Sequence, residues 1–100
     1  MSASLIWRRR AENHLQAIYD YISSENPRAA AAYTEDIVAA TERLRTFPES
    51  GRKFDSRYRQ LVVRNHLIFY HHDADRSEVS IVAIIDGRRD VLAALDDLSD

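Results

Sequence analysis

The chain has no cysteine, and only two of its 100 residues are glycine and two are proline. The absence of cysteine excludes disulfide bonds and thiol nucleophiles. It fits a reducing compartment, and we expect a cytoplasmic protein. Scarce glycine and proline predict short loops. No apolar run approaches the roughly 18 residues that a membrane span needs. The N-terminus lacks the apolar stretch of a signal peptide, so we expect neither a span nor a leader.

A chain of 100 residues is the size of one domain, which we expect to cover residues 1–100. Apolar residues make up 45% of it, an ordinary share for a globular protein. A domain of this length buries roughly two-thirds of its unfolded surface, enough for one modest core. The composition therefore predicts a small folded domain that is stable without disulfide bonds.

Hydrophobic spacing predicts two helices near the N-terminus. Apolar residues recur every three or four positions in both segments, which places them on one helical face. In the first helix they are Ala11, Leu15, Ile18 and Ile22. In the second, over residues 27–46, they are Ala30, Tyr33, Ile37, Ala40 and Leu44, and the stripe continues to Phe47. Asn26 followed by Pro27 is a helix start, because asparagine caps and proline suits the first helical position.

The remaining segments are typical of strands. We expect strands at residues 4–8, 58–63, 67–72 and 78–85, and a short helix at 91–98. In the last strand Val79, Ile81, Ala83 and Ile85 should share one face, with Val82 and Ile84 on the other. The order strand–helix–helix–strand–strand–strand predicts an α+β domain with a helical hairpin on a small, mostly antiparallel sheet. The predicted core is Leu15, Ile18, Ile22, Tyr33, Ile37, Leu44, Phe69, Ile81, Ala83 and Ile85.

The formal net charge of −2 hides an asymmetry. Residues 43–64 hold seven basic and two acidic residues, a net +5, while residues 91–100 carry −3. Thirteen of the fourteen basic residues are arginine, which contacts carboxylates and phosphates in bidentate fashion. Such a patch favours an acidic protein partner or a nucleic acid. A solvated, locally paired surface is the competing interpretation.

Motifs for catalysis or metal binding are scarce. Adjacent His71 and His72 should point to opposite faces of a strand, so we expect no metal site and no cofactor. Arg59 lies on one predicted strand, and Arg88 and Arg89 follow another. If those strands are neighbours, the three arginines could converge. They would then stabilise a phosphoryl transition state or clamp a partner's carboxylate. The simplest alternative is that Arg89 pairs with Asp86 or Asp90.

Four motifs in order resemble the RelE/ParE family of bacterial toxins, and its ParE branch in particular. They are Pro48-x-x-Gly51-Arg52, Tyr58-Arg59-x-Leu61, Leu67-Ile68-Phe69-Tyr70 and Gly87-Arg88-Arg89-Asp90. Many family members have a histidine where this chain has Asp86. The resemblance spans nearly the whole chain.

The resemblance implies a toxin of a type II toxin–antitoxin pair. RelE-like members cut messenger RNA in the ribosomal A site, and ParE-like members act on DNA gyrase. Arg59 and Arg89 fall on basic positions of the ribonuclease members, but Leu61 and Leu67 replace two cations and Leu95 replaces a tyrosine. Cleavage needs a base and charge at the phosphorane. A gyrase-binding toxin without chemistry is therefore expected, and a ribosome-dependent mRNA endoribonuclease is the alternative.

The resemblance also implies a ParD-like antitoxin as partner, whose C-terminal segment folds onto the toxin. We expect it to cover the basic stretch and an apolar groove beside the helical hairpin. Direct binding to nucleic acid is not expected except through the antitoxin complex. A plain RNA-binding or accessory domain is a third possibility. The candidate antitoxin- or target-binding residues are Arg52, Arg57, Arg59, Arg64, Tyr70, Arg88 and Arg89; a ribonuclease would use Arg59, Arg88 and Arg89.

Overall fold

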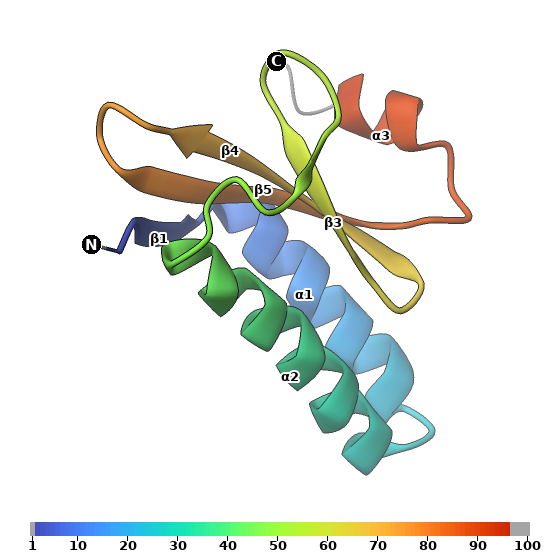
Figure 1. The fold of residues 1–100 in the computed structure, drawn as a ribbon. Coiled ribbons are helices and arrows are strands. Elements are labelled where there is room, and N and C mark those ends of the chain that lie inside the picture. Colours follow the sequence, from blue (N-terminus) through green and yellow to red (C-terminus); the bar gives the residue numbers. More distant parts are fainter. Residues whose placement is uncertain (1, 97–100) are drawn as a thin grey trace.

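The computed structural model describes residues 2–96, which form nine elements (Figure 1). They are β1 (Ser4–Trp7), α1 (Arg9–Ser23), α2 (Pro27–Glu42), the 3₁₀ turn η1 (Arg43–Arg45), β2 (Arg52–Lys53), β3 (Arg59–Val63), β4 (His66–Asp73), β5 (Glu78–Asp86) and α3 (Val91–Asp96). The predicted α+β fold is confirmed. Within the described part of the chain, no helix is long and apolar enough to cross a membrane.

The sheet has the strand order β1-β5-β4-β3-β2, in which β1 runs parallel to β5 and the other pairs are antiparallel. The α1–α2 hairpin covers one face of the sheet, and α3 lies on the opposite face (Figure 1). We call these the hairpin face and the α3 face. The predicted sheet lacked only the two-residue edge strand β2. Two residues are too few for a periodic signal.

The start of α2 matches its prediction. The Asn26 side chain accepts a hydrogen bond from Ala29 N–H at 3.1 Å, and Pro27 follows it as the first helical residue. The end of α2 differs, because the α-helix stops at Glu42 and η1 continues the chain to Arg45. A 3₁₀ turn has about three residues per turn instead of 3.6, so it rotates the following residues off the helical stripe. Phe47 is therefore 63% exposed, and its predicted place on the packed stripe was wrong.

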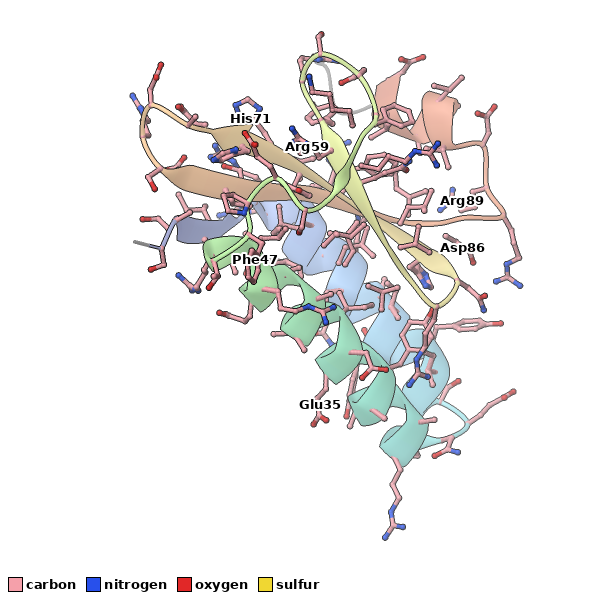
Figure 2. The ribbon with its side chains drawn as sticks, viewed as in Figure 1. Glu35, Phe47, Arg59, His71, Asp86 and Arg89 are labelled. Atoms are coloured by element: carbon pink, nitrogen blue, oxygen red, sulfur yellow. The ribbon has the colours of Figure 1, made fainter. Side chains whose placement is uncertain are left out.

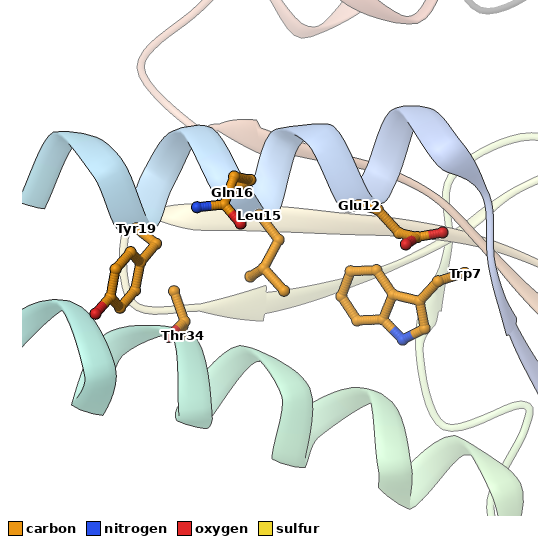
Figure 3. Close-up of a pocket in the computed structure, with 6 residues that line it drawn as sticks. All are labelled: Trp7, Glu12, Leu15, Gln16, Tyr19 and Thr34. Carbon is orange, nitrogen blue, oxygen red and sulfur yellow. The ribbon is translucent and has the colours of Figure 1, made fainter.

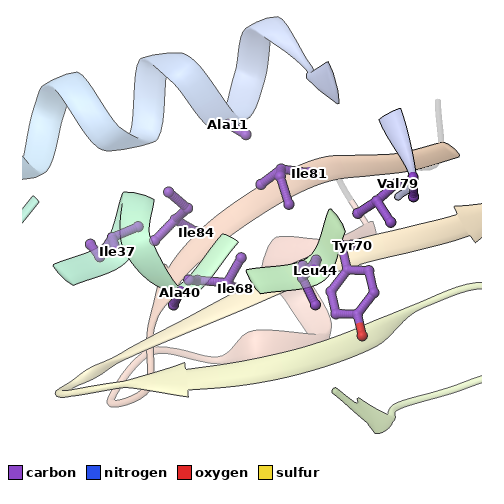
Figure 4. Close-up of a cluster of buried hydrophobic side chains, with 10 residues drawn as sticks. Ala11, Ile37, Ala40, Leu44, Ile68, Tyr70, Val79, Ile81 and Ile84 are labelled. Atoms are coloured by element: carbon purple, nitrogen blue, oxygen red, sulfur yellow. The ribbon is translucent and has the colours of Figure 1, made fainter. Parts of the chain in front are cut away.

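The main core lies between the hairpin and the sheet (Figure 4). Ile37, Leu44 and Ile81 are fully buried there, as predicted. Leu15, Ile18 and Tyr33 pack against this cluster but remain half-buried, as does Ile22 in α1. The members of the cluster are Ala3, Ala11, Ile37, Ala40, Leu44, Ile68, Tyr70, Val79, Ile81 and Ile84.

A β-bulge in the β4–β5 pair corrects the predicted alternation of β5. Tyr70 pairs with Ile81 while its neighbour Phe69 pairs with Ala83, so Val82 is the extra residue. Beyond a bulge the side chains change face. Ile81 therefore packs on the hairpin face and Ala83 on the α3 face, not on one face together. The α3-face cluster consists of Phe69, Ala83, Ile85 and Leu95.

On the side of β5 that faces β1, no strand among residues 2–96 pairs with β5 beyond Ile81, because β1 ends at Trp7. His14 of α1 substitutes there: its Nδ1 accepts a hydrogen bond from Ile84 N–H at 3.0 Å. Burial lowers the pKa of His14, and the positive charges of Arg10 and Arg89 lower it further. The neutral imidazole thus satisfies a strand N–H that would otherwise lack a partner.

The short helix predicted at residues 91–98 begins at Val91 as expected and is described to Asp96. Leu95 packs on the α3 face and is 7% exposed, whereas Leu92 is 67% exposed. Leu98, the last apolar residue of that prediction, lies outside the described residues.

Candidate functional site

Arg59 does not converge with Arg88 and Arg89, so the predicted cluster was wrong. Arg59 lies opposite Tyr70, which lies opposite Ile81, whereas the two other arginines follow Asp86 at the far end of β5. β4 separates the two strands, and the ends differ by about 15 Å along the strand direction. Figure 2 shows Arg59 and Arg89 well apart.

Arg59 instead holds a loop of its own chain. Its Nη1 donates to Gly51 O at 2.9 Å and to Glu49 O at 3.2 Å. Tyr70, which is fully buried, donates through its hydroxyl to Pro48 O at 2.9 Å and accepts from Gly51 N–H at 2.9 Å. Burial raises the pKa of the Tyr70 hydroxyl. A buried phenol with both functions occupied cannot contact a partner, so Tyr70 has a structural role.

The glycine of the Pro48-x-x-Gly51 motif is required by this packing. A Cβ at position 51 would lie 2.5 Å from the Tyr70 hydroxyl oxygen, closer than non-bonded atoms approach. The motif therefore belongs to a loop that packs tightly against β4, and this packing explains why the motif contains a glycine.

The basic stretch 43–64 does not form one surface. Arg45 pairs with Glu42 at 2.7 Å, and Arg64, in the β3–β4 turn, pairs with Asp36 at 2.6 Å. Three further exposed cations lie along β2 and the following loop, and we call them the basic cluster: Arg52, Lys53 and Arg57.

The basic cluster borders a small pocket of about 180 Å³, which Lys53 and Arg57 line with His71 and His72. The Arg57 guanidinium lies 5.0 Å from the Tyr58 ring centre, a cation–π contact that presents it to solvent. The pocket also holds Glu49 and Asp55, so its charge is mixed.

The part of the α3 face that β3 and β4 form beside α3 carries no cation at the positions paired across these strands. Cross-strand pairing places Gln60 beside Phe69 and Val62 beside Leu67 on this face. Val62 is 70% exposed, and Leu61 lies on the opposite, hairpin face. Arg52, paired with Gln60 from the edge strand, is the cation that β2 adds to this face. Leu95 packs here as part of the core.

A second group of polar residues lies where β3 turns into β4 and β5 ends. Tyr33 Oη lies 2.6 Å from His66 Nδ1 and accepts from Asn65 N–H at 3.3 Å. Burial lowers the pKa of His66 most, Asp86 raises it, and Arg88 lowers it again. The sequence carried no signal for this contact, because Tyr33 reads as one member of an apolar stripe.

Arg88, not Arg89, pairs with Asp86, which corrects the predicted partner. The carboxylate receives Arg88 N–H, Nε and Nη2 at 2.9, 3.0 and 2.6 Å. These hydrogen bonds hold the pKa of Asp86 far below its usual value. Arg89 is exposed, and its side chain forms no ion pair with any residue between 2 and 96.

The helical hairpin carries an open groove of about 700 Å³ on its outer side (Figure 3). Its walls combine apolar surface from Trp7, Leu15 and Tyr19 with the polar side chains of Glu12, Gln16 and Thr34. The sequence predicted an apolar groove beside the hairpin, whereas three of the six residues that line this groove are polar. Among residues 2–96, no three His, Asp or Glu side chains gather as metal ligands.

The comparisons with known proteins identify relatives over most of the chain. The family model described as ParE toxin of type II toxin-antitoxin system, parDE, matches residues 5–91. A curated relative, Toxin RelE2 of Caulobacter vibrioides, is 34% identical over 73 residues, which cover 73% of this chain and 83% of the relative.

Solved structures share the fold. The chromosomal ParDE system from P. aeruginosa superposes with a TM-score of 0.72 at 26% identity, covering 85% of this chain and 96% of that chain. A mutant of the E. coli toxin RelE in the free state gives 0.70 at 10% identity, covering 94% and 93%. The RelBE2 complex of Mycobacterium tuberculosis gives 0.64 at 15% identity, covering 86% and 99%.

Proposed function

Because the chain belongs to the ParE toxin family of type II toxin–antitoxin systems, we propose that it acts by binding DNA gyrase and not by cutting RNA. One observation supports this most: beside α3, β3 and β4 present Gln60, Val62 and Leu67 on the α3 face. None of these side chains is a cation, an acid or a base.

RNA cleavage makes demands that these side chains do not meet. A general base must remove the proton of the 2′-hydroxyl, and positive charge must stabilise the phosphorane. Leu95, where ribonuclease members of the family carry a tyrosine, is buried against Phe69 and Ala83. Arg59, one of the two basic residues that matched the ribonuclease pattern, is occupied with backbone carbonyls, and the other, Arg89, lies at the far end of β5. A toxin that works by binding needs none of these groups.

The name of the Caulobacter relative, Toxin RelE2, keeps a ribosome-dependent endoribonuclease as the second candidate. Two assays on the purified chain separate the candidates. We expect loss of gyrase supercoiling and no codon-phased cuts in ribosome-bound message. Cleavage of message with supercoiling unaffected would reverse the ranking.

We further propose that the chain is neutralised by a ParD-like antitoxin, since related solved structures are toxin–antitoxin systems. The C-terminal segment of the antitoxin would fold as a helix in the groove between α1 and α2, and its apolar side chains would pack on Trp7, Leu15 and Tyr19. Acidic residues of the same segment would meet the basic cluster, because exposed arginines invite carboxylates. Charge would speed association, and apolar burial would slow dissociation.

Charge reversal tests the basic cluster. Lys53→Glu with Arg57→Glu should weaken antitoxin binding by about tenfold or more, measured by calorimetry at low salt. Arg59 is left intact because its guanidinium holds the Pro48–Gly51 loop. The control reverses Arg9 and Arg28, two exposed helical arginines outside the cluster. Equal affinities for both double variants would show that the cluster is only a solvated surface.

A further inference from the structure

A pocket of about 410 Å³ lies where the helical hairpin meets the end of the sheet. We call it the turn-end pocket. It is separate from the outer groove of the hairpin and from the basic cluster, and it shares no lining residue with either. Its lining residues are Ala17, Ile18, Tyr21, Ile22, Tyr33, Asn65, His66, Asp86, Arg88 and Arg89.

One part of the turn-end pocket is apolar. Ala17, Ile18 and Ile22 line it from α1, and both isoleucines are only half-buried by the protein's own core. Tyr21 stands beside them with 83% of its surface exposed, an unusual state for a tyrosine in a small domain. A bound apolar side chain would remove this surface from water, which is favourable at roughly 25 cal/mol per Å².

In the charged part of the pocket the one carboxylate is already paired, and two donors face the pocket. Asp86 already receives three N–H groups from Arg88. Tyr33 Oη accepts from Asn65 N–H, and we assign the phenol proton to its hydrogen bond with His66 Nδ1. An imidazole whose Nδ1 accepts carries its proton on Nε2 and is a donor there. Arg89 adds a guanidinium that forms no ion pair with any described residue.

We propose that the turn-end pocket binds a protein segment in which an apolar side chain stands next to a carboxylate. The apolar side chain would pack on Ile18 and Ile22, and the carboxylate would accept hydrogen bonds from Arg89 and His66. A carboxylate is an acceptor-only group, and it matches the donors that Arg89 and His66 present. A nucleobase edge presents donors as well as acceptors, and its donors would compete with Arg88 for the Asp86 carboxylate.

This inference deepens the proposed function, because the segment would belong to the protein on which the toxin acts. The antitoxin would occupy the outer groove and the basic cluster, and the target would occupy the turn-end pocket. The toxin would then carry two separate binding surfaces.

The chemistry of the pocket can be tested without any target. Methyl NMR of the full chain would follow Ile18 and Ile22 during titration with N-acetyl-leucine and, separately, its uncharged amide. We expect both methyl signals to shift, with the acid binding about fivefold more tightly than the amide, the size of one exposed charge pair. Arg89→Gln should abolish this preference. Equal binding of acid and amide, or shifts confined to the outer groove, would overturn the proposal.

The link to the target is tested in cells. Arg89→Glu should raise the expression level that is needed for growth arrest by about tenfold or more, because the glutamate repels the partner's carboxylate. Antitoxin affinity should stay unchanged, and Arg28→Glu is the control for charge. If Arg89→Glu arrests growth as strongly as the parent, the target does not use this pocket. If gyrase is unaffected but the preference for the acid and the loss of growth arrest are both observed, the proposal for the pocket is supported and only gyrase is rejected as the target.

Discussion

Ten side chains are buried between the sheet and the helical hairpin, and four are buried between the sheet and α3. The hairpin contributes helices of 15 and 16 residues, and α3 contributes 6. A short helix gains little stability of its own and relies on packing. The free energy of folding therefore rests mainly on the hairpin face. Residues of the α3 face, such as Val62, can then differ between relatives at small cost to stability.

The largest effect should come from the hairpin face. Ile37 is fully buried between α2 and the sheet, so Ile37→Ala should lower the free energy of unfolding by about 2–5 kcal/mol. Urea titration followed by circular dichroism measures this. The neighbouring Val38, 38% exposed, supplies the control, and Val38→Ala should cost clearly less. Equal losses would show that the helix is rotated from the position described.

The clamp on the Pro48–Gly51 loop should give the next effect. Tyr70→Phe removes the hydroxyl that Gly51 N–H and Pro48 O share, and each buried group left without a partner costs about 1–3 kcal/mol. We expect a total loss of about 2–3 kcal/mol with little change in the fold. Tyr21→Phe, on an exposed ring, is the matched control. A Tyr70→Phe variant as stable as the parent would mean that water replaces the phenol.

The α3 face should respond less than the hairpin face. Leu95 is 7% exposed, but its short helix can shift into the space left by a smaller side chain. Leu95→Ala should cost about 2 kcal/mol, the low end for buried leucines. Leu92→Ala, on the exposed side of α3, should cost almost nothing. Hydrogen exchange should also be faster in α3 than in α1, and similar protection would contradict the comparison.

Acid should weaken the hairpin face further. The pKa values of His14 and His66 are both lowered in the folded state, first by burial. As the pH falls, these histidines therefore bind protons more readily in the unfolded chain than in the folded chain. The contribution of the two histidines to the free energy of unfolding is fully present above pH 6.5, the pKa of a histidine in the unfolded chain, and it falls as the pH drops below that value. Denaturation at about pH 7.5 and 5.5 measures the difference. His14→Gln should reduce this difference, because it removes one of the two histidines.

The smallest effect should come from the ion pair at the rim of the hairpin face. Arg64 and Asp36 are 2.6 Å apart but about half exposed, at 49% and 51%. Solvent screens such pairs, so a double-mutant cycle with alanine should give a coupling of about 0.5 kcal/mol or less at physiological salt. A coupling above 1 kcal/mol would mean that solvent screens this pair less than its exposure implies.

The helices were predictable because their signal is local. Spacing of three and four residues identified Ile37 and Leu44, and Asn26 before Pro27 marked the start of α2. The bulge at Val82 was not predictable, since β5 has apolar residues on both faces and a slip of one position leaves no trace in hydropathy. The final assignment of faces in β5 thus required coordinates.

The candidate site was less predictable than the fold. Arg59 looked available because its acceptors are backbone carbonyls, which no sequence pattern reveals. The expectation that Arg59 converges with Arg88 and Arg89 could have been avoided, however. Arg59 opens the first strand of an antiparallel meander, and Arg88 follows the end of the third, so the two had to lie at opposite ends. The turn-end pocket has no motif, because its residues come from four separate segments.

The hydroxyl of Tyr70 has a consequence for a protein without cysteine. It ties residues 48 and 51 to residue 70 through two hydrogen bonds, and so closes a loop in the manner of a cross-link. Closing such a loop in the folded chain costs entropy that increases only slowly with its length. Unlike a disulfide, this tie does not depend on the redox state of its surroundings. Reducing conditions, which open disulfides, would leave the loop and the exposed Phe47 beside it in place.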